Sequence, residues 1–167
     1  MIGDESSVVI RPYVPGQDAG GTHTAFWLAI TRTAIADYES DQVAAWAGAE
    51  DVDLSLWDAR RVVAHTFVAA VDGKIAGFVD VLDDGLLDML FVHPDFGRRG
   101  IARLLVAAAK REAKSAGLAG LRTYASRTAR PAFEKLGFSV LAYRPDNVVN
   151  GQIVPNYEMR CDFALQS

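Results

Sequence analysis

The order of apolar and turn-forming segments predicts a mixed α/β fold in which helices flank a mostly antiparallel sheet. Three β-rich segments, residues 66–71, 74–82 and 86–92, follow one another and are separated by Asp72-Gly73 and Asp83-Asp84-Gly85. Short turns of this kind join antiparallel strands, so these segments should form a meander. A helix and another strand follow the meander. That order favours a parallel strand–helix–strand crossover.

The part before the meander is predicted to be mainly helical. Residues 8–11 should form a first strand that Pro12 and Pro15 end. Apolar residues then recur with helical spacing. Ser40 and Asp41 are expected to cap the second helix. The expected helices are residues 18–36, 40–47 and 54–64.

The part after the meander alternates helices and strands. Its first helix should stop at Gly117, a residue type favoured just after a helix end. The last two strands should pair across a long loop, residues 144–155. The expected elements are a helix over 100–116, a strand over 121–125, a helix over 128–136, and strands over 137–143 and 156–163.

Size and charge limit the classes of function. The 167 residues fit one domain, residues 1–167, with a single core. The formal net charge is −4, from 21 acidic and 17 basic residues, which disfavours a nucleic-acid partner. Basic residues nevertheless concentrate between Arg98 and Lys114. Local positive charge on an acidic body suits a small polyanionic ligand.

The sequence also indicates the cellular compartment in which the protein is expected. Its first residues are acidic and poor in apolar side chains, so no signal peptide is expected. No apolar run approaches the length of a membrane span. The lone Cys161, expected to be buried filler, cannot form an internal disulfide, which suits a reducing compartment. We therefore expect a cytoplasmic protein with no membrane partner.

The turn between the strand 86–92 and the next helix carries the strongest functional signal. It reads Val92-His-Pro-Asp-Phe-Gly-Arg-Arg-Gly-Ile-Ala-Arg-Leu-Leu105. A strand–turn–helix aims unpaired N–H groups and the positive helix end at one point, which is a site for phosphate. Arg98, Arg99 and Arg103 add guanidinium groups suited to phosphate oxygens. A plain connection with solvated arginines is the alternative. The patterns of nucleoside triphosphatases and of dinucleotide-binding folds are absent.

This segment resembles the acyl-CoA pyrophosphate loop of the GNAT superfamily of N-acetyltransferases. The pattern of that family is Gln or Arg, two residues, Gly, one residue, then Gly or Ala. Gly100 and Ala102 match its last two positions, and Gly97 stands where Gln or Arg is usual. The resemblance therefore rests on the backbone cradle, which does not need that side chain.

A second segment, residues 126–138, resembles the downstream motif of the same family. That motif usually reads Asn, two residues, Ala, three residues, Tyr, three residues, Gly-Phe. Ala129 and Gly137-Phe138 agree with it, whereas Ser126 replaces Asn and Phe133 replaces Tyr. The order of the predicted elements also matches the family fold over nearly the whole chain.

The resemblance implies a fold, an activity and a co-substrate. The fold is a sheet in which the strands near residues 86–92 and 121–125 splay into a V-shaped cleft. The activity is transfer of an acetyl group from acetyl-CoA to an amine of a small molecule, by direct attack in a ternary complex. The implied cofactor-binding residues are Leu90, Phe91, Val92, Arg98, Arg99, Gly100, Ile101, Ala102, Arg103, Ser126, Ala129 and Phe133.

Asp88 is the leading catalytic candidate. It is a carboxylate within an otherwise apolar strand, where buried acids are rare unless they are paired or functional. It could accept the proton of the amine, hold a cationic substrate, or play a structural role. Asp80 on the neighbouring strand is a weaker candidate. The group that protonates the departing thiolate stays open among Tyr124, Tyr143, Tyr157 and solvent. No histidine pair has metal spacing, and no metal is expected.

The acceptor should lie against the first two helices and the loop before the last strand. Tyr38 and Trp27 are the candidate substrate-binding residues, and Tyr38 is expected nearest the ligand. The replacements at Gly97 and Phe133 leave an alternative, a catalytically lapsed CoA-binding or sensing domain of the same fold. The resemblance is also compatible with a homodimer paired through exposed strand edges. The sequence does not decide the identity of the acceptor amine, whether another acyl-CoA is preferred, or the oligomeric state.

Overall fold

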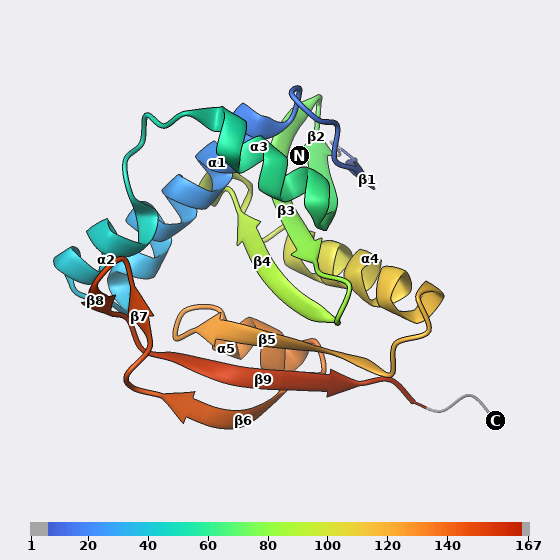
Figure 1. The fold of residues 1–167 in the computed structure, drawn as a ribbon. Coiled ribbons are helices and arrows are strands. Elements are labelled where there is room, and N and C mark those ends of the chain that lie inside the picture. The colour runs from blue at the N-terminus through green and yellow to red at the C-terminus, as the bar shows by residue number, and fades with distance from the viewer. Residues whose placement is uncertain (1–6, 165–167) are drawn as a thin grey trace, which may run out of the picture.

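The computed structural model describes residues 7–164, and within this range seven strands form one sheet. The strand order is β1-β2-β3-β4-β5-β9-β6, and helices flank the sheet (Figure 1). The predicted mixed, mostly antiparallel sheet is thereby confirmed. The expectation that the acidic N-terminus is no signal peptide concerns residues that lie mostly outside the described range.

The antiparallel meander forms as predicted. Its strands are β2 (His65–Val71), β3 (Lys74–Val81) and β4 (Leu86–Val92), and β1 (Val8–Pro12) adds to the free side of β2. Asp72 and Gly73 both have positive φ, 50° and 77°. A tight hairpin turn needs this conformation at both central residues, which explains why this dipeptide joins β2 to β3.

The strands β4 and β5 (Gly120–Ser126) pair in parallel and then separate. Their register covers Leu86 with Arg122 and Leu87 with Thr123. At the last pair the buried Thr123 hydroxyl donates to the Leu87 carbonyl oxygen over 2.8 Å. Beyond it the two strands diverge and open the predicted V (Figure 1).

A bulge in β4 lies at the apex of this V. The register between β3 and β4 passes from Asp80 with Met89 to Val81 with Leu87, so Asp88 is an extra residue on β4. A bulge re-aims side chains and breaks the regular alternation along a strand. The sequence pattern alone does not show it, because an inserted residue looks like any other member of the strand.

The C-terminal half of the sheet contains β9 (Asn156–Asp162) between β5 and β6 (Ser139–Arg144). The predicted antiparallel pairing of the last two long strands is confirmed. The expected loop 144–155 instead contains a small hairpin, β7 (Val148–Val149) with β8 (Gln152–Ile153). Its turn is Asn150-Gly151 with positive φ at both residues, a signal that was present in the sequence.

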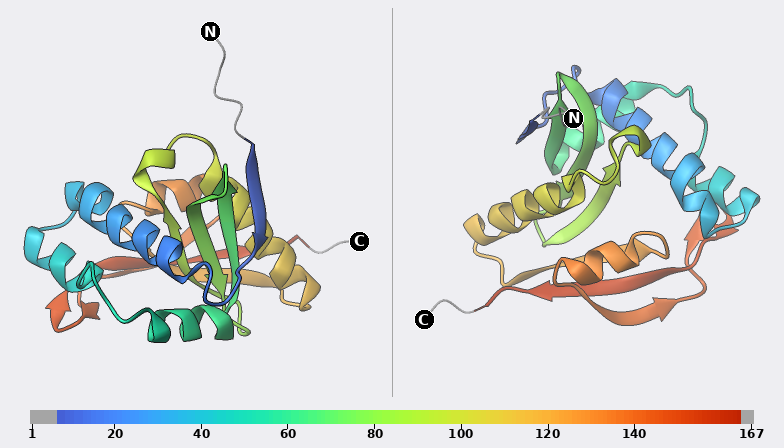
Figure 2. Two further views of the ribbon diagram at one scale, coloured as in Figure 1. Left: turned by 90° about the horizontal axis from the view of Figure 1, so that it is seen from above. Right: turned by 180° about the vertical axis from the view of Figure 1, so that it is seen from behind.

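The helices form layers on both faces of the sheet. α1 (Ala19–Leu28) and α3 (Leu54–Val63) pack on the face opposite α4 (Ile101–Ser115), as the two views of Figure 2 show. α2 (Ser40–Ala47) extends the first layer, and α5 (Arg130–Lys135) packs on the C-terminal half. Glu39, rather than Ser40 or Asp41, is the N-cap of α2.

The predicted long helix 18–36 is helical throughout most of its length but changes its winding. After α1 comes a π-helical turn (Ala29–Thr33) and then a 3₁₀ turn (Ala34–Ala36). The Thr31 hydroxyl donates to the Trp27 carbonyl oxygen over 2.8 Å, a side-chain bond that often bends helices. Single π turns are common at functional sites, and this one faces the pocket described below.

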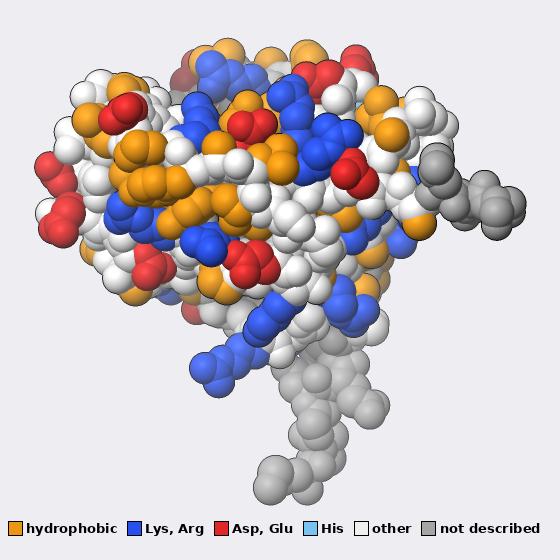
Figure 3. Space-filling view, turned by 90° about the horizontal axis from the view of Figure 1, so that it is seen from below, with side chains coloured by type: hydrophobic (Ala, Val, Ile, Leu, Met, Phe, Trp, Pro, Cys, Tyr) orange, Lys and Arg blue, Asp and Glu red, His pale blue; other side chains and the backbone are white. Residues whose placement is uncertain are grey.

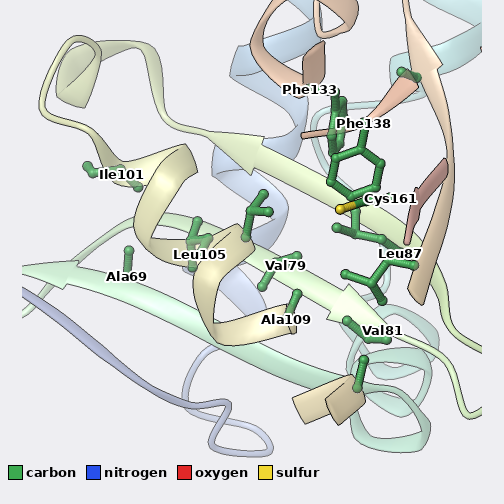
Figure 4. Close-up of a cluster of buried hydrophobic side chains, with 14 of the residues drawn as sticks. Ala69, Val79, Val81, Leu87, Ile101, Leu105, Ala109, Phe133, Phe138 and Cys161 are labelled. Atoms are coloured by element: carbon green, nitrogen blue, oxygen red, sulfur yellow. The ribbon is translucent and has the colours of Figure 1, made fainter. Parts of the chain in front are cut away.

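The hydrophobic core between α4 and the sheet holds the strands on either side of the V in place. Buried side chains of α4 pack on β3 and on the start of β4, while β5, α5 and β9 contribute a second group that meets them (Figure 4). Cys161 is buried among these side chains, as expected of a filler residue. The main contributors are Val79, Val81, Leu87, Ile101, Leu105, Ala109, Phe133 and Phe138.

Gly77 allows close approach of β3 to β4 and α4, and replacing it should destabilise the protein. A Cβ at this position would lie 2.8 Å from the Phe91 carbonyl oxygen and 3.2 Å from a Leu105 methyl carbon. We expect Gly77→Ala to lower the free energy of unfolding in urea by about 1–3 kcal/mol, as overpacking commonly does. The control is Gly20→Ala in α1, where the new Cβ has ordinary contacts and should stabilise slightly. Equal effects of the two variants would contradict this account.

Candidate functional site

The turn between β4 and α4 presents unpaired backbone N–H groups. A short 3₁₀ turn (Pro94–Phe96) leads to Arg98 and Gly100, whose φ values are 63° and 72°. Gly100 is the N-cap of α4, and the Leu104 N–H is the one that bonds back to its carbonyl oxygen, over 3.1 Å. The N–H groups of the three residues between them belong to the first turn, where no intrahelical acceptor exists. They form an anion cradle at the positive end of the helix.

Basic side chains surround this cradle. Arg98, Arg99 and Arg103 are all exposed, and the Arg99 guanidinium lies 5.5 Å from the centre of the Phe96 ring. Gly97 precedes them with an extended backbone and no side chain to add. The turn therefore combines backbone donors with formal positive charge, which is the composition expected of a phosphate site.

A pocket of about 290 Å³ lies between the splayed strands and reaches the start of α4. The sequence-predicted residues that line it are Asp88, Leu90, Phe91, Val92, Ala102, Ser126, Ala129 and Phe133. Phe133 contributes an apolar wall rather than a hydroxyl. Of the other predicted cofactor residues, Ile101 has its side chain buried in the core, and the remainder belong to the cradle. Residues of the π turn, including Ile30 and Thr33, also line this pocket and were missed.

The open edge of β4 adds backbone donors to this pocket. The His93 N–H donates to the Ala76 carbonyl oxygen of β3 over 2.8 Å. Backbone groups alternate between the two edges along an antiparallel strand, so the N–H groups of Val92 and Leu90 point away from β3. They face the V, where β5 has already diverged. An amide-bearing ligand in the V would satisfy them.

A smaller pocket of about 130 Å³ adjoins the first one. The two share Asp88, Phe91, Tyr124, Ser126 and Trp46. The wall of the smaller pocket is mostly aromatic and apolar, with Asn147 and Asn156 as polar members. Within residues 7–164, the buried Oδ1 of Asn156 has no hydrogen-bond partner. The smaller pocket can therefore hold a compact ligand with a hydrogen-bond donor.

Asp88 lies at the junction of the two pockets and is exposed. The apolar pattern of its strand suggested a buried carboxylate, and that expectation is wrong. The bulge turns Asp88 out of the regular alternation of β4, so its carboxylate meets the pockets instead of the core. An accessible carboxylate at this junction can accept a proton from a ligand or attract a cationic one.

The buried acid of this region is Asp80 on β3, which is 0% exposed. Its Oδ2 lies 3.0 Å from Nε of Arg61, which is also buried. Burial raises the pKa of Asp80 to about 7; Arg61 acts against this shift, and the negative charge of Asp88 adds to it. Asp80 is therefore poised to exchange a proton near neutral pH.

The two predicted substrate-binding residues have different surroundings. The buried ring of Tyr38 lines the smaller pocket, while its hydroxyl donates to the Pro155 carbonyl oxygen over 2.6 Å and accepts from the Arg127 N–H over 2.8 Å. Trp27 donates from Nε1 to the Gly48 carbonyl oxygen and is not among the residues that line either pocket. Trp46 of α2 lines both.

The three tyrosines considered as proton donors to the departing thiolate also differ in their surroundings. Tyr124 on β5 lines both pockets, and the Arg144 guanidinium lies 4.2 Å from its ring centre. Tyr143 and Tyr157 pack against each other with ring centres 5.1 Å apart and are not among the lining residues. The geometry thus singles out Tyr124 among them.

The fold and the two joined pockets define an acyl-CoA-dependent transferase, and comparison with known proteins agrees. The sequence model of the acetyltransferase (GNAT) domain matches residues 34–161. The chain is 34% identical over 137 residues to an uncharacterized N-acetyltransferase, YafP, of Escherichia coli K12, covering 81% of this chain and 84% of the relative. The chain belongs to the GNAT acetyltransferase family.

Solved structures give the same result. A GCN5-related N-acetyltransferase from Rhodopseudomonas palustris superposes with a TM-score of 0.88 at 31% identity, covering 95% of this chain and 97% of that one. The PaiA N-acetyltransferase of Thermoplasma acidophilum, solved with coenzyme A, has the same fold, with a TM-score of 0.75, 18% identity, and 94% and 99% of the two chains covered. The protein is an N-acetyltransferase with acetyl-CoA as co-substrate.

Two other features are absent from the described range. Among residues 7–164, no His, Cys, Asp and Glu side chains gather in a group of three or more that could hold a metal ion. Across the same residues, no helix has the length and apolar character needed to cross a membrane.

The raised pKa of Asp80 predicts how stability depends on pH. The folded protein holds the Asp80 proton up to about pH 7, whereas the unfolded chain releases it near 3.8, so the folded state binds more protons between these values. The contribution of this residue to stability must then fall as pH rises through this window. We expect wild type to lose stability relative to Asp80→Asn between about pH 5 and about pH 8 in urea titrations. A constant difference would contradict the shift.

Proposed function

We propose that the protein transfers the acetyl group of acetyl-CoA to an amine of a small molecule by direct attack in a ternary complex. The observation that carries this proposal is the junction of the two pockets at Asp88. One pocket suits the acyl donor and the other a compact acceptor, so both substrates would meet beside one carboxylate. Attack from a ternary complex needs no protein nucleophile.

In this proposal the larger pocket and the cradle hold the cofactor. The pyrophosphate would lie against the first N–H groups of α4 and beside Arg98, Arg99 and Arg103. The amide-bearing arm would follow the open edge of β4, where the N–H groups of Leu90 and Val92 face the V. Ser126, Ala129 and Phe133 would form the opposite wall. A β4 N–H is then placed to polarise the thioester oxygen.

The chemistry falls to the two side chains at the junction. Asp88 would accept a proton from the acceptor ammonium, because a neutral amine is required for attack on the thioester carbon. Tyr124, which lines both pockets, would donate a proton to the departing thiolate and regain one through solvent from the acylated nitrogen, which must lose its second proton to become an amide. Tyr38 and Asn156 line the smaller pocket and would contact the acceptor.

The cofactor assignment predicts the effect of a charge in the cradle. Gly100 has a positive φ of 72°, and Gly100→Glu would strain the backbone and place a carboxylate beside the phosphates. We expect the affinity for CoA, measured by calorimetry, to fall at least about tenfold, which corresponds to about 1.4 kcal/mol. Gly48→Glu is the matched control, because Gly48 also has a positive φ but is not among the residues that line the two pockets. Unchanged affinity in Gly100→Glu would show that the assigned site is wrong.

The catalytic assignment predicts a pH-dependent loss in Asp88→Asn. The variant keeps the shape and removes the basicity, and losing a positioned base commonly costs about 10²–10⁴-fold in rate. We expect kcat/KM to fall at neutral pH while CoA affinity stays unchanged. The loss should shrink at high pH, because a primary amine with a pKa near ~10 then becomes neutral by itself.

The matched control for Asp88→Asn is Asp51→Asn, an exposed acid in the loop before α3. It should have wild-type kinetics. An unfolded Asp88→Asn protein would make the residue structural, and an unaltered rate at neutral pH would place the base elsewhere.

We further propose that the chain acts as a single domain that forms a homodimer. Among the described residues β6 ends the sheet, so one of its edges lacks a neighbouring strand. Val140, Leu141 and Tyr143 are exposed on it. Figure 3 views the side of the molecule that carries this strand and shows hydrophobic side chains gathered among Lys and Arg. Exposed apolar edge strands favour pairing with another chain.

Light scattering over a dilution series tests this assembly. We expect a dimer mass at high concentration for wild type and a monomer mass for Leu141→Lys, since a charge on an edge strand opposes pairing. A wild-type protein that stays monomeric throughout would remove the proposal.

The lone buried Cys161 supports a cytoplasmic location, which cell fractionation would test.

A further inference from the structure

The smaller pocket of the site has a wall of aromatic rings that pack against one another. Phe26 of α1 meets Phe91 of β4 edge to face, with ring centres 4.9 Å apart. The Trp46 ring of α2 lies 6.2 Å from that of Phe91 and 5.6 Å from that of Tyr38. Tyr124 of β5 adds a fifth ring to the lining. Aromatic rings bind further rings in edge-to-face or offset contacts, so this wall favours an aromatic ligand.

The size of this pocket suits a single ring. Its volume is about 130 Å³. For comparison, an apolar cavity of about 150 Å³ takes up one benzene molecule. Val149 of the β7–β8 hairpin belongs to the lining, and hydrogen bonds hold this hairpin on α2. The Asn150 side chain donates to the Ala45 carbonyl oxygen over 2.8 Å, and the Gln42 side chain donates to that of Ile153 over 2.9 Å. These bonds fix the wall and therefore the size of the pocket.

Most polar side chains of this lining already have partners within the chain. The Tyr38 hydroxyl is bonded to two backbone groups. Asn147 donates from Nδ2 to the Val154 carbonyl oxygen over 2.9 Å. The Ser126 hydroxyl accepts from the Ala129 N–H over 3.0 Å. These groups contribute little to ligand recognition, and the pocket selects chiefly by shape and apolar contact.

The charge of the pocket is negative. Considering residues 7–164, Asp88 is the one charged side chain among those that line it. Arg127 lies 5.3 Å from the centre of the Tyr38 ring. Arg144 lies 4.2 Å from the centre of the Tyr124 ring. Neither arginine is among the lining residues. A ligand carboxylate would therefore meet a like charge and no countercharge in the lining, whereas an ammonium gains from Asp88 and from the faces of the rings.

We propose that the acceptor is a compact primary amine in which a short aliphatic chain joins the nitrogen to one aromatic ring, and which has no carboxylate. The inference rests on the proposed function. The ring occupies the smaller pocket, and the ammonium lies beside Asp88, where the two pockets meet. The aliphatic link matters because an amine bonded directly to a ring is mostly neutral at pH 7 and has no proton for Asp88 to accept. Amino acids, polyamines and amino sugars do not fit this pocket.

The first test compares matched amines with the wild-type protein. Phenethylamine and phenylalanine differ by the carboxylate alone, and spermidine and glucosamine represent the polyamines and amino sugars. We expect kcat/KM, followed by thiol release from acetyl-CoA, to be at least about a hundredfold higher for phenethylamine than for phenylalanine, because like charges that face each other in a binding site are strongly unfavourable. An equal or higher value for phenylalanine, spermidine or glucosamine would overturn the proposal.

The second test supplies the missing countercharge. Val149→Lys places an ammonium in the lining of the smaller pocket, and Val148→Lys is the matched control on the neighbouring position of β7, which is 59% exposed and not a lining residue. We expect Val149→Lys to lower the ratio of kcat/KM for phenethylamine to that for phenylalanine at least about tenfold. Val148→Lys should keep the wild-type ratio. The same ratio in both variants would contradict the assignment of the pocket. If Val149→Lys does not fold, the wild-type measurements decide the matter.

A binding measurement separates this inference from the function on which it rests. Calorimetry of wild type saturated with CoA, which cannot donate an acetyl group, reports acceptor binding without turnover. We expect phenethylamine to bind and phenylalanine not to bind. If phenethylamine binds but no amine of a broad panel is acetylated, the proposed function fails and the assignment of the pocket stands. If other amines are acetylated while phenethylamine neither binds nor reacts, the assignment of the pocket alone is overturned.

Discussion

The separation of β4 from β5 is the constraint on which the rest of the site depends. Their pairing ends at Leu87 with Thr123, where the Thr123 hydroxyl binds the Leu87 carbonyl oxygen. Each strand keeps its other neighbour, β3 for β4 and β9 for β5, so the sheet remains stable while one seam opens. The open seam exposes backbone donors that would otherwise be paired, and it creates a pocket that passes through the sheet. An amide-bearing ligand can complete the hydrogen bonding of the strand.

The bulge at Asp88 turns this opening into a junction. An extra residue on β4 lies where the V begins, and this residue lines both pockets of the site. The larger and the smaller pocket therefore share one carboxylate. The bulge thus sets the place where the two pockets meet. It also explains why Asp88 is exposed while its neighbour Asp80 is buried.

Much of the fold could be predicted because local patterns and tertiary packing agree. Alternation and the Asp72-Gly73 turn indicate the meander, and the Gly100–Ala102 segment indicates the cradle at the start of α4. The hairpin of β7 and β8 was missed although Asn150-Gly151 is a strong turn signal, because two-residue strands have no periodicity to detect. The π turn after α1 was missed because a single wider turn inside a helix is not marked by any particular residue type.

The sequence by itself determined the family, the element order and the position of the anion cradle at the start of α4, because these depend on local motifs and on the backbone of a single turn. The tertiary structure decided the burial of the two acids and the surroundings of the predicted aromatics. Asp88 and Asp80 both occur in apolar strands, and their difference arises from the bulge and from the packing of α3 over β3. The Tyr38 hydroxyl is hydrogen-bonded to Pro155 and Arg127, which lie about a hundred residues away in the sequence, and no local pattern encodes these contacts. Burial and pairing are properties of chain segments brought together by folding, and they cannot be read from any one segment.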